Sequence, residues 1–306
     1  TLRKILHPSL TLRVQDYENY MPELPEVETI RRDLKKKILN KKIKQVLVTG
    51  KARVNLDHKG FVKVLKNRKF VNIDRVGKLL IFDIDLKNRF LLVHLKMTGQ
   101  LIYTRGQQVT AGGHSDVKYN FNLPDKSTRV TFEFVDGRKL FFNDSRRFGY
   151  LRIVNATELQ KVKEKFGIEP LVKNFTLENF EKILQGRKTN IKAILLNQQL
   201  IAGIGNIYAD EACFDARVLP GTQVSELTSG QVLKLHRAVE KVIKKAIEER
   251  GTTFNNYRDS EGKRGNFLKF LKVYGRVGLK CKRCSGIIEK TKVAGRGTHF
   301  CSKCQK

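Results

Sequence analysis

The chain has 306 residues, which is room for roughly two domains of about 150 residues each. Apolar residues make up 40% of it, enough for a sizeable buried core. Lysine and arginine number 61 against 30 aspartates and glutamates, so the formal net charge is +31. This excess predicts a polyanionic partner, with nucleic acid favoured over an anionic membrane surface. No apolar run approaches the roughly 20 residues that span a bilayer, so the membrane alternative is limited to peripheral contact.

The first twenty residues lack the continuous apolar core and the small-residue cleavage site of a secretory signal. We therefore expect an intracellular, cytoplasmic protein. Four of the five cysteines lie in the last 26 residues, and in a reducing compartment clustered cysteines bind metal more often than they form disulfides. Cys213 stands alone, and we expect it to be a packing residue.

The N-terminal half begins with a helical pattern and continues with strands. Between residues 27 and 38, apolar residues recur every three or four positions and basic residues fill the other face, which predicts an amphipathic helix. From about Lys44 to Val154 the pattern favours strands: apolar and polar residues alternate over 130–134, and Asp136-Gly137 is a hairpin signal. Several short strands in succession predict a β-sandwich or barrel.

The second half has a different organisation. Alternation stops at residues 155–174, which we interpret as a linker, and helical periodicity then returns. The expected helices lie within residues 180–184, 191–198, 207–214 and 231–249. We thus divide the chain into an extension at 1–20, a first domain at 21–154, the linker, a helical domain at 175–258, and a cysteine-bearing segment at 259–306. That last segment has 13 basic and 3 acidic residues.

The cysteines of the last segment form two pairs. Two residues separate Cys281 from Cys284 and Cys301 from Cys304, and sixteen residues lie between the pairs. Each Cys-x-x-Cys turn offers two thiolates to one edge of a tetrahedron, so the spacing predicts one closed, structural zinc site, with two disulfides as the alternative. Between the pairs, Arg296 lies in a glycine-flanked turn, where it either contacts phosphate or is simply a solvated charge.

A short glycine turn precedes one of the expected helices. Residues 203–206 read Gly-Ile-Gly-Asn and lead into a helix that starts near Ile207. Asn206 could cap this helix while the free N–H groups face an anion. The alternative is an ordinary capped turn between packed helices.

Residues 21–28 read Met-Pro-Glu-Leu-Pro-Glu-Val-Glu, which suits the start of a helix because prolines and acids favour that end. The run also resembles the start of the bacterial formamidopyrimidine-DNA glycosylases. The resemblance continues in order through Gly77-Lys78, residues 94–99, 143–149, 203–211 and 273–276, and the cysteine pairs. It implies an α+β protein with an N-terminal β-sandwich and flanking helix, a helix-two-turns-helix domain, and a four-cysteine zinc finger.

The family resemblance implies a bifunctional DNA glycosylase and AP lyase of base excision repair, which removes 8-oxoguanine and formamidopyrimidines from damaged double-stranded DNA. Pro22, freed by loss of the initiator methionine, would attack the sugar C1′ and form a Schiff base before β- and δ-elimination. Glu23 would be the general acid, with a raised pKa. Lys78 and Arg296 would supply protons for the β- and δ-elimination steps, and Glu26 would bond the ring-opened sugar.

Base excision requires the damaged nucleotide to leave the duplex. The resemblance implies that the vacated space is filled by Met97, Arg146 and Phe148. It implies that DNA is contacted by Arg146, Lys188, Lys192, Asn206 and Tyr274. It also implies a lid over the extruded base that contains Arg258, Asp259, Gly262 and Gly265.

The sequence departs from the family pattern in two places. Ser127 stands where family members commonly have a DNA-contacting histidine, so that contact is either lost or supplied by Lys126 or Arg129. Residues 1–20 precede the Met-Pro start, and an internal Pro22 has an amide nitrogen that cannot act as a nucleophile. Because Met21 is the first methionine, we hypothesise that translation begins there.

Three alternative functions remain. One is an oxidised-pyrimidine glycosylase of the endonuclease VIII type, whose members usually begin Pro-Glu-Gly-Pro; Leu24 argues against it. Another is a catalytically silent binder of damaged DNA, which is favoured if residues 1–20 are retained. A zinc-ribbon transcription factor would leave residues 22–28 unexplained. We expect a monomer that associates with the bacterial nucleoid.

Overall fold

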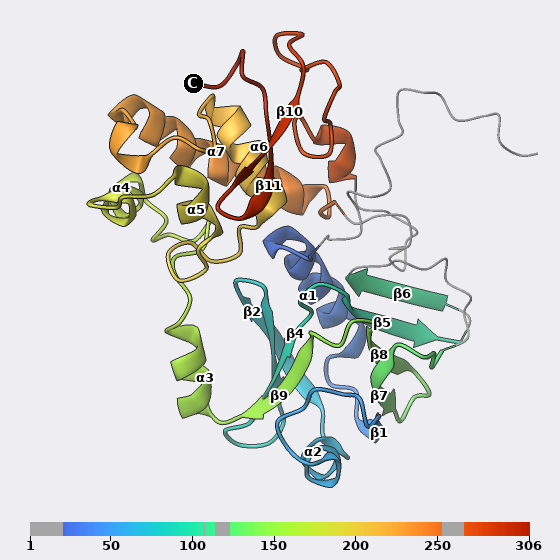
Figure 1. Ribbon diagram of the computed structural model, residues 1–306. Helices are drawn as coiled ribbons and strands as arrows, with labels where there is room; N and C mark the ends of the chain where they lie inside the picture. The colour runs from blue at the N-terminus through green and yellow to red at the C-terminus, as the bar shows by residue number, and fades with distance from the viewer. Residues whose placement is uncertain (1–20, 107, 114–122, 253–265) are drawn as a thin grey trace, which may run out of the picture.

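The computed structural model describes residues 21–106, 108–113, 123–252 and 266–306 (Figure 1). The first element is helix α1 (Leu24–Ile38), which starts with a reciprocal capping box between Glu23 and Glu26. Its apolar stripe is buried at every fourth or third position, as the sequence predicts. Figure 1 shows the start of α1 at the junction between a lobe of sheets and a lobe of helices.

The first lobe is the expected β-sandwich. One sheet has the order β1-β7-β8-β5-β6 and the other the order β2-β3-β4-β9, with antiparallel pairing throughout. The strands are β1 (Ile43–Val48), β2 (Phe70–Val76), β3 (Leu79–Ile84), β4 (Phe90–His94), β5 (Gly99–Arg105), β6 (Gln108–Gly113), β7 (Thr128–Phe134), β8 (Lys139–Asp144) and β9 (Tyr150–Val154). The ring of Phe70 lies 5.1 Å from that of Phe82 in its own sheet and 5.9 Å from that of Phe132 in the other, so these aromatic side chains join the two layers.

Two short helices depart from the sequence-based expectation. Helix α2 (His58–Leu65) lies within the region expected to form only strands, and helix α3 (Ala156–Lys163) lies within the expected linker. Side-chain caps start both helices: Asp57 accepts from the N–H of Gly60, and Asn155 forms a capping box with Glu158. Each helix has only one or two buried residues, so its sequence shows little helical periodicity of apolar positions.

The second lobe is helical, as expected. It contains α4 (Leu177–Leu184), α5 (Ile191–Leu196), α6 (Asn206–Ala216) and α7 (Ser229–Glu248), with short 3-10 turns at Val224–Glu226 and Phe267–Phe270. Cys213 is fully buried in the core of this lobe, which confirms its packing role. Leu24 belongs to the same core, and its N–H donates to the carbonyl of Gly203 at 3.0 Å. The chain segment before α1 is thereby fixed to the helical lobe.

A hairpin completes the C-terminal end. Strands β10 (Glu289–Val293) and β11 (Arg296–Phe300) pair as a two-stranded sheet, and β11 packs against α6. The tip of the hairpin carries Arg296. Within the described parts of the chain, no helix is both long enough and apolar enough to span a bilayer.

Candidate active site

A cavity of about 1030 Å³ lies where the two lobes meet. Met21 and Glu23, the neighbours of the buried Pro22, both line it. The cavity also brings together six other residues singled out from the sequence: Lys78, Met97, Phe148, Asn206, Tyr274 and Arg296. These residues come from both lobes and from the zinc hairpin, so the site exists only when all three parts are assembled.

Glu23 is held at the start of α6. Its two carboxyl oxygens accept hydrogen bonds from the N–H groups of Gly205, at 2.8 Å, and Ile207, at 3.0 Å. Burial raises the pKa of Glu23 to about 7, although the positive charge of Lys78 and these two N–H groups act in the opposite direction. Glu23 therefore keeps its proton to near neutral pH, as a general acid requires.

In place of a bound anion, the protein's own Glu23 carboxyl group thus lies at the α6 N-terminus. Gly205, and not Asn206, occupies the N-cap position, so the prediction that Asn206 caps the helix is wrong. A Cβ at Gly205 would lie 2.3 Å from the carboxyl carbon of Glu23, which explains why glycine is needed there. Asn206 instead donates from Nδ2 to the carbonyl of Gly297 at 3.0 Å, linking α6 to the hairpin.

Lys78 is buried opposite Glu23. Its ammonium donates to the carbonyl of Ile204 at 3.0 Å. Burial lowers the pKa of Lys78, while the carboxyl groups of Glu23 and Glu26 partly oppose that shift. Lys78 and Glu23 thus both line the cavity, and the charge of each shifts the pKa of the other.

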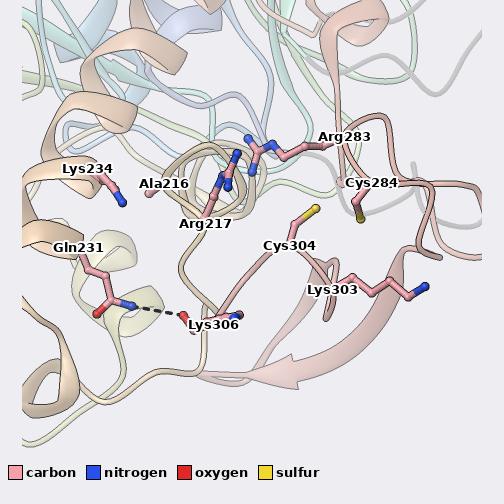
Figure 2. A pocket seen from close by; sticks show the side chains of 9 residues that line it. All are labelled: Ala216, Arg217, Gln231, Lys234, Arg283, Cys284, Lys303, Cys304 and Lys306. Carbon is pink, nitrogen blue, oxygen red and sulfur yellow. Dashed lines mark hydrogen bonds between the residues drawn. The ribbon is translucent and has the colours of Figure 1, made fainter.

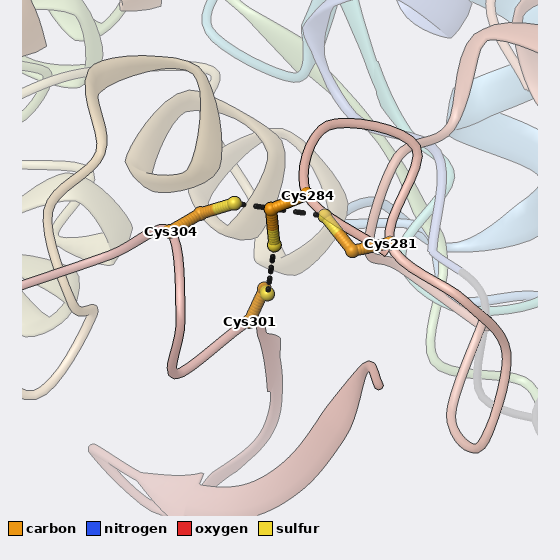
Figure 3. Close-up of side chains that lie close together, drawn as sticks. All are labelled: Cys281, Cys284, Cys301 and Cys304. Carbon is orange, nitrogen blue, oxygen red and sulfur yellow. Dashed lines mark hydrogen bonds between the residues drawn. The ribbon is translucent and has the colours of Figure 1, made fainter. Parts of the chain in front are cut away.

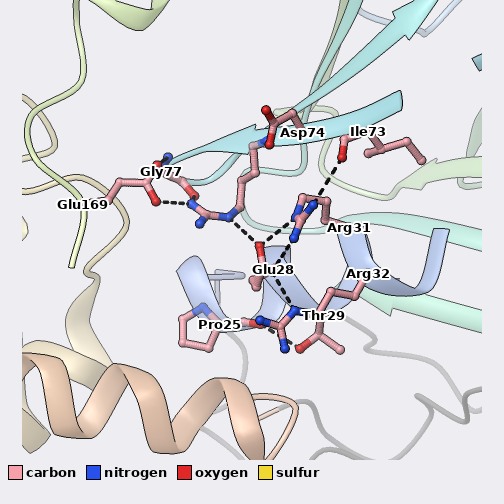
Figure 4. Close-up of polar contacts among 10 residues, drawn as sticks. Pro25, Glu28, Thr29, Arg31, Arg32, Ile73, Asp74, Gly77 and Glu169 are labelled. Carbon is pink, nitrogen blue, oxygen red and sulfur yellow. Dashed lines mark hydrogen bonds and ion pairs between the residues drawn. The ribbon is translucent and has the colours of Figure 1, made fainter. Parts of the chain in front are cut away.

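An ionic network fixes the turn that presents Lys78. The preceding Gly77 has a φ of +53°, its N–H donates to Glu169 at 2.7 Å, and its carbonyl accepts from Arg75 at 2.8 Å. Arg75 also pairs with Glu169 at 2.6 Å and with Glu28 of α1 at 3.1 Å (Figure 4). The network thus ties β2, α1 and the segment between the lobes together behind Lys78.

Glu28 is the centre of that network. Its carboxylate accepts hydrogen bonds from Arg31 and Arg32, both at 2.7 Å (Figure 4). Burial alone would raise the pKa of Glu28, but these hydrogen bonds and the charge of Arg75 lower it to about 2. Glu28 is therefore ionised and has a structural role.

Glu26 lies behind Glu23 and does not line the cavity. Its carboxylate accepts from the N–H of Glu23 at 3.0 Å, the hydroxyl of Tyr208 at 2.6 Å, and both the N–H and the hydroxyl of Thr252, at 2.8 and 3.0 Å. The contact between Glu26 and the ring-opened sugar stays a prediction. The carboxylate of Glu26 holds the segment that contains Pro22 and Glu23.

The three residues expected to fill the DNA lesion space lie on two neighbouring turns. Met97 is on the turn between β4 and β5, and Arg146 and Phe148 are on the turn between β8 and β9. The side chain of Phe148 is 44% exposed, and the guanidinium of Arg146 lies 5.4 Å from the centre of its ring. An exposed aromatic ring beside an arginine is suited to insertion into DNA.

Thr98 and Asp144 connect these two turns, and we call them the Thr98–Asp144 clasp. The hydroxyl of Thr98 donates to one carboxylate oxygen of Asp144 and accepts from the N–H of Arg146 at 3.1 Å. The other oxygen of Asp144 accepts from the N–H of Gly149 at 2.7 Å. The clasp is buried and fixes the backbone of both turns.

The structure overturns one of the expected phosphate contacts. Lys192 is fully buried, and its ammonium donates to Asp210 at 2.6 Å, to the hydroxyl of Thr298 at 2.8 Å and to the carbonyl of Gly297 at 3.1 Å. An ammonium has three donors, so none remains for DNA. Lys192 therefore positions the β10–β11 hairpin, and Asp210 adds to this by accepting the backbone N–H of His299 at 2.8 Å.

The other expected DNA contacts are accessible to different degrees. Tyr274 is half-buried at the cavity wall, whereas Lys188 is exposed on the loop before α5, outside the cavity lining. Arg129 does not supply the DNA contact that family members make with a histidine at the position of Ser127. Its guanidinium is buried and donates to backbone carbonyls, including that of Asp144 at 2.9 Å. Lys126 is exposed and stays available.

Sequence reasoning missed Glu211, which positions Tyr274. The carboxylate of Glu211 accepts the backbone N–H groups of Lys272, Val273 and Tyr274 at 2.9–3.0 Å. The available signal was the acidic pair Asp210-Glu211 in the middle of a helix whose neighbouring residues are mostly apolar. Paired acids in a buried helix require partners. Here Glu211 holds the segment before the first cysteine pair, and Asp210 holds His299 just before the second.

The expected lid residues Arg258, Asp259, Gly262 and Gly265 lie outside the described residues. The four cysteines of the last segment do come together (Figure 3). Their sulfur atoms all lie within 4.8 Å of one another, with Cys281 and Cys304 3.7 Å apart and Cys284 and Cys301 3.6 Å apart. A tetrahedron with Zn–S bonds of about 2.3 Å requires such separations, so the four thiolates fit one zinc ion.

Comparisons with known proteins agree with this arrangement. Family models match in chain order: the formamidopyrimidine-DNA glycosylase N-terminal domain at residues 21–151, the H2TH domain of the same glycosylases at 166–257, and a zinc finger found in FPG and IleRS at 278–306. A formamidopyrimidine-DNA glycosylase of Desulfitobacterium hafniense is 39% identical over 93% of this chain and all of its own length. One from Symbiobacterium thermophilum is 40% identical over 93% of this chain and 89% of its own. Among solved structures, the Lactococcus lactis Fpg in complex with DNA containing an abasic site matches with a TM-score of 0.82 and 34% identity, over 93% of this chain and 99% of that chain.

Proposed function

Because the chain belongs to the formamidopyrimidine-DNA glycosylase family, we propose that it is a DNA glycosylase and AP lyase that removes 8-oxoguanine and formamidopyrimidines from duplex DNA. The observation that carries this proposal is the placement of Glu23. A carboxyl group with a pKa of about 7 directly follows Pro22 and faces a cavity that also contains Lys78 and Arg296.

In the proposed reaction, the nitrogen of an N-terminal Pro22 attacks C1′ of the damaged nucleotide. The N-glycosidic bond breaks and its electron pair leaves with the base, while Glu23 donates a proton to the leaving group or to the ring oxygen. Loss of the amine proton and opening of the sugar give a Schiff base. An α-amino group titrates near pH 8, so a useful fraction of the nucleophile is unprotonated at neutral pH.

The Schiff base withdraws electrons from the sugar, which permits β-elimination at C3′ and then δ-elimination at C5′. Lys78 is the proposed proton donor for the first elimination, and its lowered pKa makes the release of a proton easier. Arg296 is the proposed group for the second, since it lines the cavity from the hairpin tip. The buried Lys192–Asp210 pair keeps that hairpin in place.

DNA would enter along the lobe junction. We propose that Met97, Arg146 and Phe148 fill the space left by the flipped nucleotide, and that Lys188, Asn206 and Tyr274 contact phosphates. We also propose that the enzyme acts on the bacterial chromosome as a monomer.

This chemistry requires a free amine at Pro22. With residues 1–20 attached, the nitrogen of Pro22 is an amide without a usable lone pair. We therefore propose that the active protein begins at Pro22, a proposal supported by the start of the first family match at Met21. Intact mass of the natively expressed protein tests it directly, and a chain that keeps the extra residues would support lesion binding without catalysis.

Borohydride trapping on defined duplexes tests the function. A protein that begins at Pro22 should form a covalent adduct on an 8-oxoguanine duplex and release the base. A clear preference for an oxidised-pyrimidine duplex would favour the alternative specificity, which is worth testing because a Lactococcus lactis neighbour was solved with DNA containing an oxidised pyrimidine. Tight binding without an adduct would favour the silent binder.

A further inference from the structure

A second basic cavity lies at the far end of α6. It has a volume of about 550 Å³ and shares no lining residue with the cavity at the lobe junction (Figure 2). Asn206 at the start of α6 lines the first cavity, and Ala216 at its end lines the second. With a rise of about 1.5 Å per residue, the helix separates them by about 15 Å.

Five cationic side chains line this second cavity, which we call the α6 C-terminal cavity. They come from the end of α6, from α7, from the first cysteine turn and from the last residues of the chain: Arg217, Lys234, Arg283, Lys303 and Lys306. No aspartate or glutamate is among its lining residues, and across the described residues none of the five makes an ion pair with an acidic side chain. Cations from four segments thus converge on one hollow that no aspartate or glutamate lines.

The walls of the α6 C-terminal cavity are fixed in place. Arg283 stacks on the ring of Phe214 at 4.2 Å and donates to the carbonyl of Phe214 at 2.8 Å. Arg217 ends α6 with a φ of +62°, a conformation that glycine usually adopts at this position. The backbone oxygen of Lys306 accepts from the N–H of Leu219 at 3.2 Å. The Arg283 guanidinium and the backbone at Arg217 and Lys306 are therefore held in place around the cavity.

The zinc centre offers a competing explanation for these charges. A zinc ion with four thiolates carries about two negative charges, and Cys284 and Cys304 line the cavity. The five positive charges exceed these two negative charges. The net charge of the cavity stays positive even if a terminal carboxylate at Lys306 adds a third negative charge. Neutralisation of the zinc site therefore accounts for only part of the cluster.

We propose that the α6 C-terminal cavity is a second phosphate-binding site, separate from the DNA cleft at the lobe junction. Guanidinium forks and ammonium groups together recognise phosphate oxygens, and the volume suits a short run of linked phosphates. Such phosphates come either from a soluble polyphosphate or from the backbone of a second DNA segment. The site would let the enzyme bind a second polyanion while the first cleft is filled.

The test uses the zinc-loaded full chain with its DNA cleft already saturated by a short duplex carrying an uncleavable abasic analogue. Calorimetry with inorganic tripolyphosphate, and separately with a short undamaged duplex, measures residual binding. Binding of tripolyphosphate alone identifies a soluble polyphosphate as the ligand, and binding of the duplex identifies a DNA backbone. If neither titrant binds the saturated complex, the proposal is overturned.

Variants locate the site. The double variant Arg217→Ala/Lys234→Ala should weaken residual binding at least about tenfold, since it removes two charge-assisted contacts. The charge-preserving pair Arg217→Lys/Lys234→Arg should retain it. Lys161→Ala/Lys163→Ala on α3 removes the same charge from two exposed positions far along the chain and should change nothing.

Zinc content and base excision are measured for every variant. The proposal fails if the double variant binds as tightly as the Lys161/Lys163 control, or if its loss of binding follows only from loss of zinc. Lys234→Glu, a substitution at an exposed residue of α7, is then an independent test of the binding site because it leaves the cysteine turns unchanged. Because excision occurs in the other cavity, failure here leaves the proposed catalytic function unaffected.

Discussion

Removal of the Lys192 ammonium would distinguish a positioning role from a DNA contact. Lys192→Met keeps the length of the side chain but removes the ammonium partner of Asp210, which then keeps only its contacts with the backbone N–H of His299, at 2.8 Å, and with Nδ1 of the same residue, at 3.1 Å. Both members of the pair are completely buried, with 2.6 Å between Nζ and Oδ1. Loss of one partner of a buried ion pair typically lowers the free energy of unfolding by about 3–5 kcal/mol, because the remaining charge loses its main compensation.

Lys182 on α4 provides a matched control. Its ammonium lies at the same 2.6 Å from Glu178, but the two side chains are 63% and 75% exposed. Solvent screens such a pair, so Lys182→Met should cost no more than about 0.5 kcal/mol. The comparison isolates burial, since both substitutions remove a lysine from an equally short contact.

Urea denaturation measures the stabilities, and the salt dependence of DNA binding measures the contacts. Lys192→Met should leave the slope of log K against log salt unchanged, whereas loss of a phosphate contact would reduce it by about 0.9. The second change Asp210→Asn should recover part of the lost stability by removing the stranded charge. The reasoning is refuted if Lys192→Met is as mild as Lys182→Met, or if it lowers the salt slope.

Three further predictions concern the cavity and the zinc site. Base release should slow as pH rises above about 7, because Glu23 then loses the proton that it must donate; single-turnover rates unchanged up to pH 9 would contradict this role. Thr98→Val should lower excision from duplex DNA about tenfold, because it leaves Asp144 and the Arg146 N–H without their shared partner. Thr98→Ser should keep near-normal excision, and Thr98→Val should still cleave a preformed abasic site in single-stranded DNA at a near-normal rate. Equal losses by Thr98→Val on both substrates would argue against a role in filling the lesion space. Removal of zinc by a chelator should abolish cleavage of duplex DNA, and added zinc should restore it, since the hairpin that carries Arg296 depends on the metal; full activity of the zinc-free protein would contradict that dependence.

Local patterns in the sequence were sufficient for much of the fold. Patterns among residues close together in the sequence predicted the observed structure in three places. These are the helical period of residues 27–38, the alternation in β7 and the spacing of the cysteine pairs. Helices α2 and α3 escaped detection because each is short and has few buried residues. Their starts are visible in the sequence only through the caps at Asp57 and Asn155.

The polar interior of the site depended on distant partners and could not be predicted in the same way. From the sequence, Lys192 resembles an exposed phosphate contact. In the structure its ammonium is buried and pairs with Asp210, 18 residues away. Glu26 meets Tyr208 across 182 residues and Thr252 across 226. Glu23 replaces Asn206 as the partner of the α6 N-terminus for the same reason. Such contacts arise when segments far apart in the sequence pack together, and neither pattern nor propensity encodes them.

The central claim is that the nitrogen of Pro22 forms the covalent bond to the sugar. The most direct measurement is peptide mass mapping of the borohydride-trapped complex, prepared from protein that begins at Pro22. We expect the sugar adduct on the peptide that starts with Pro22, and no adduct when residues 1–20 are left attached. An adduct on a lysine such as Lys78, or equal trapping by the extended chain, would contradict the account.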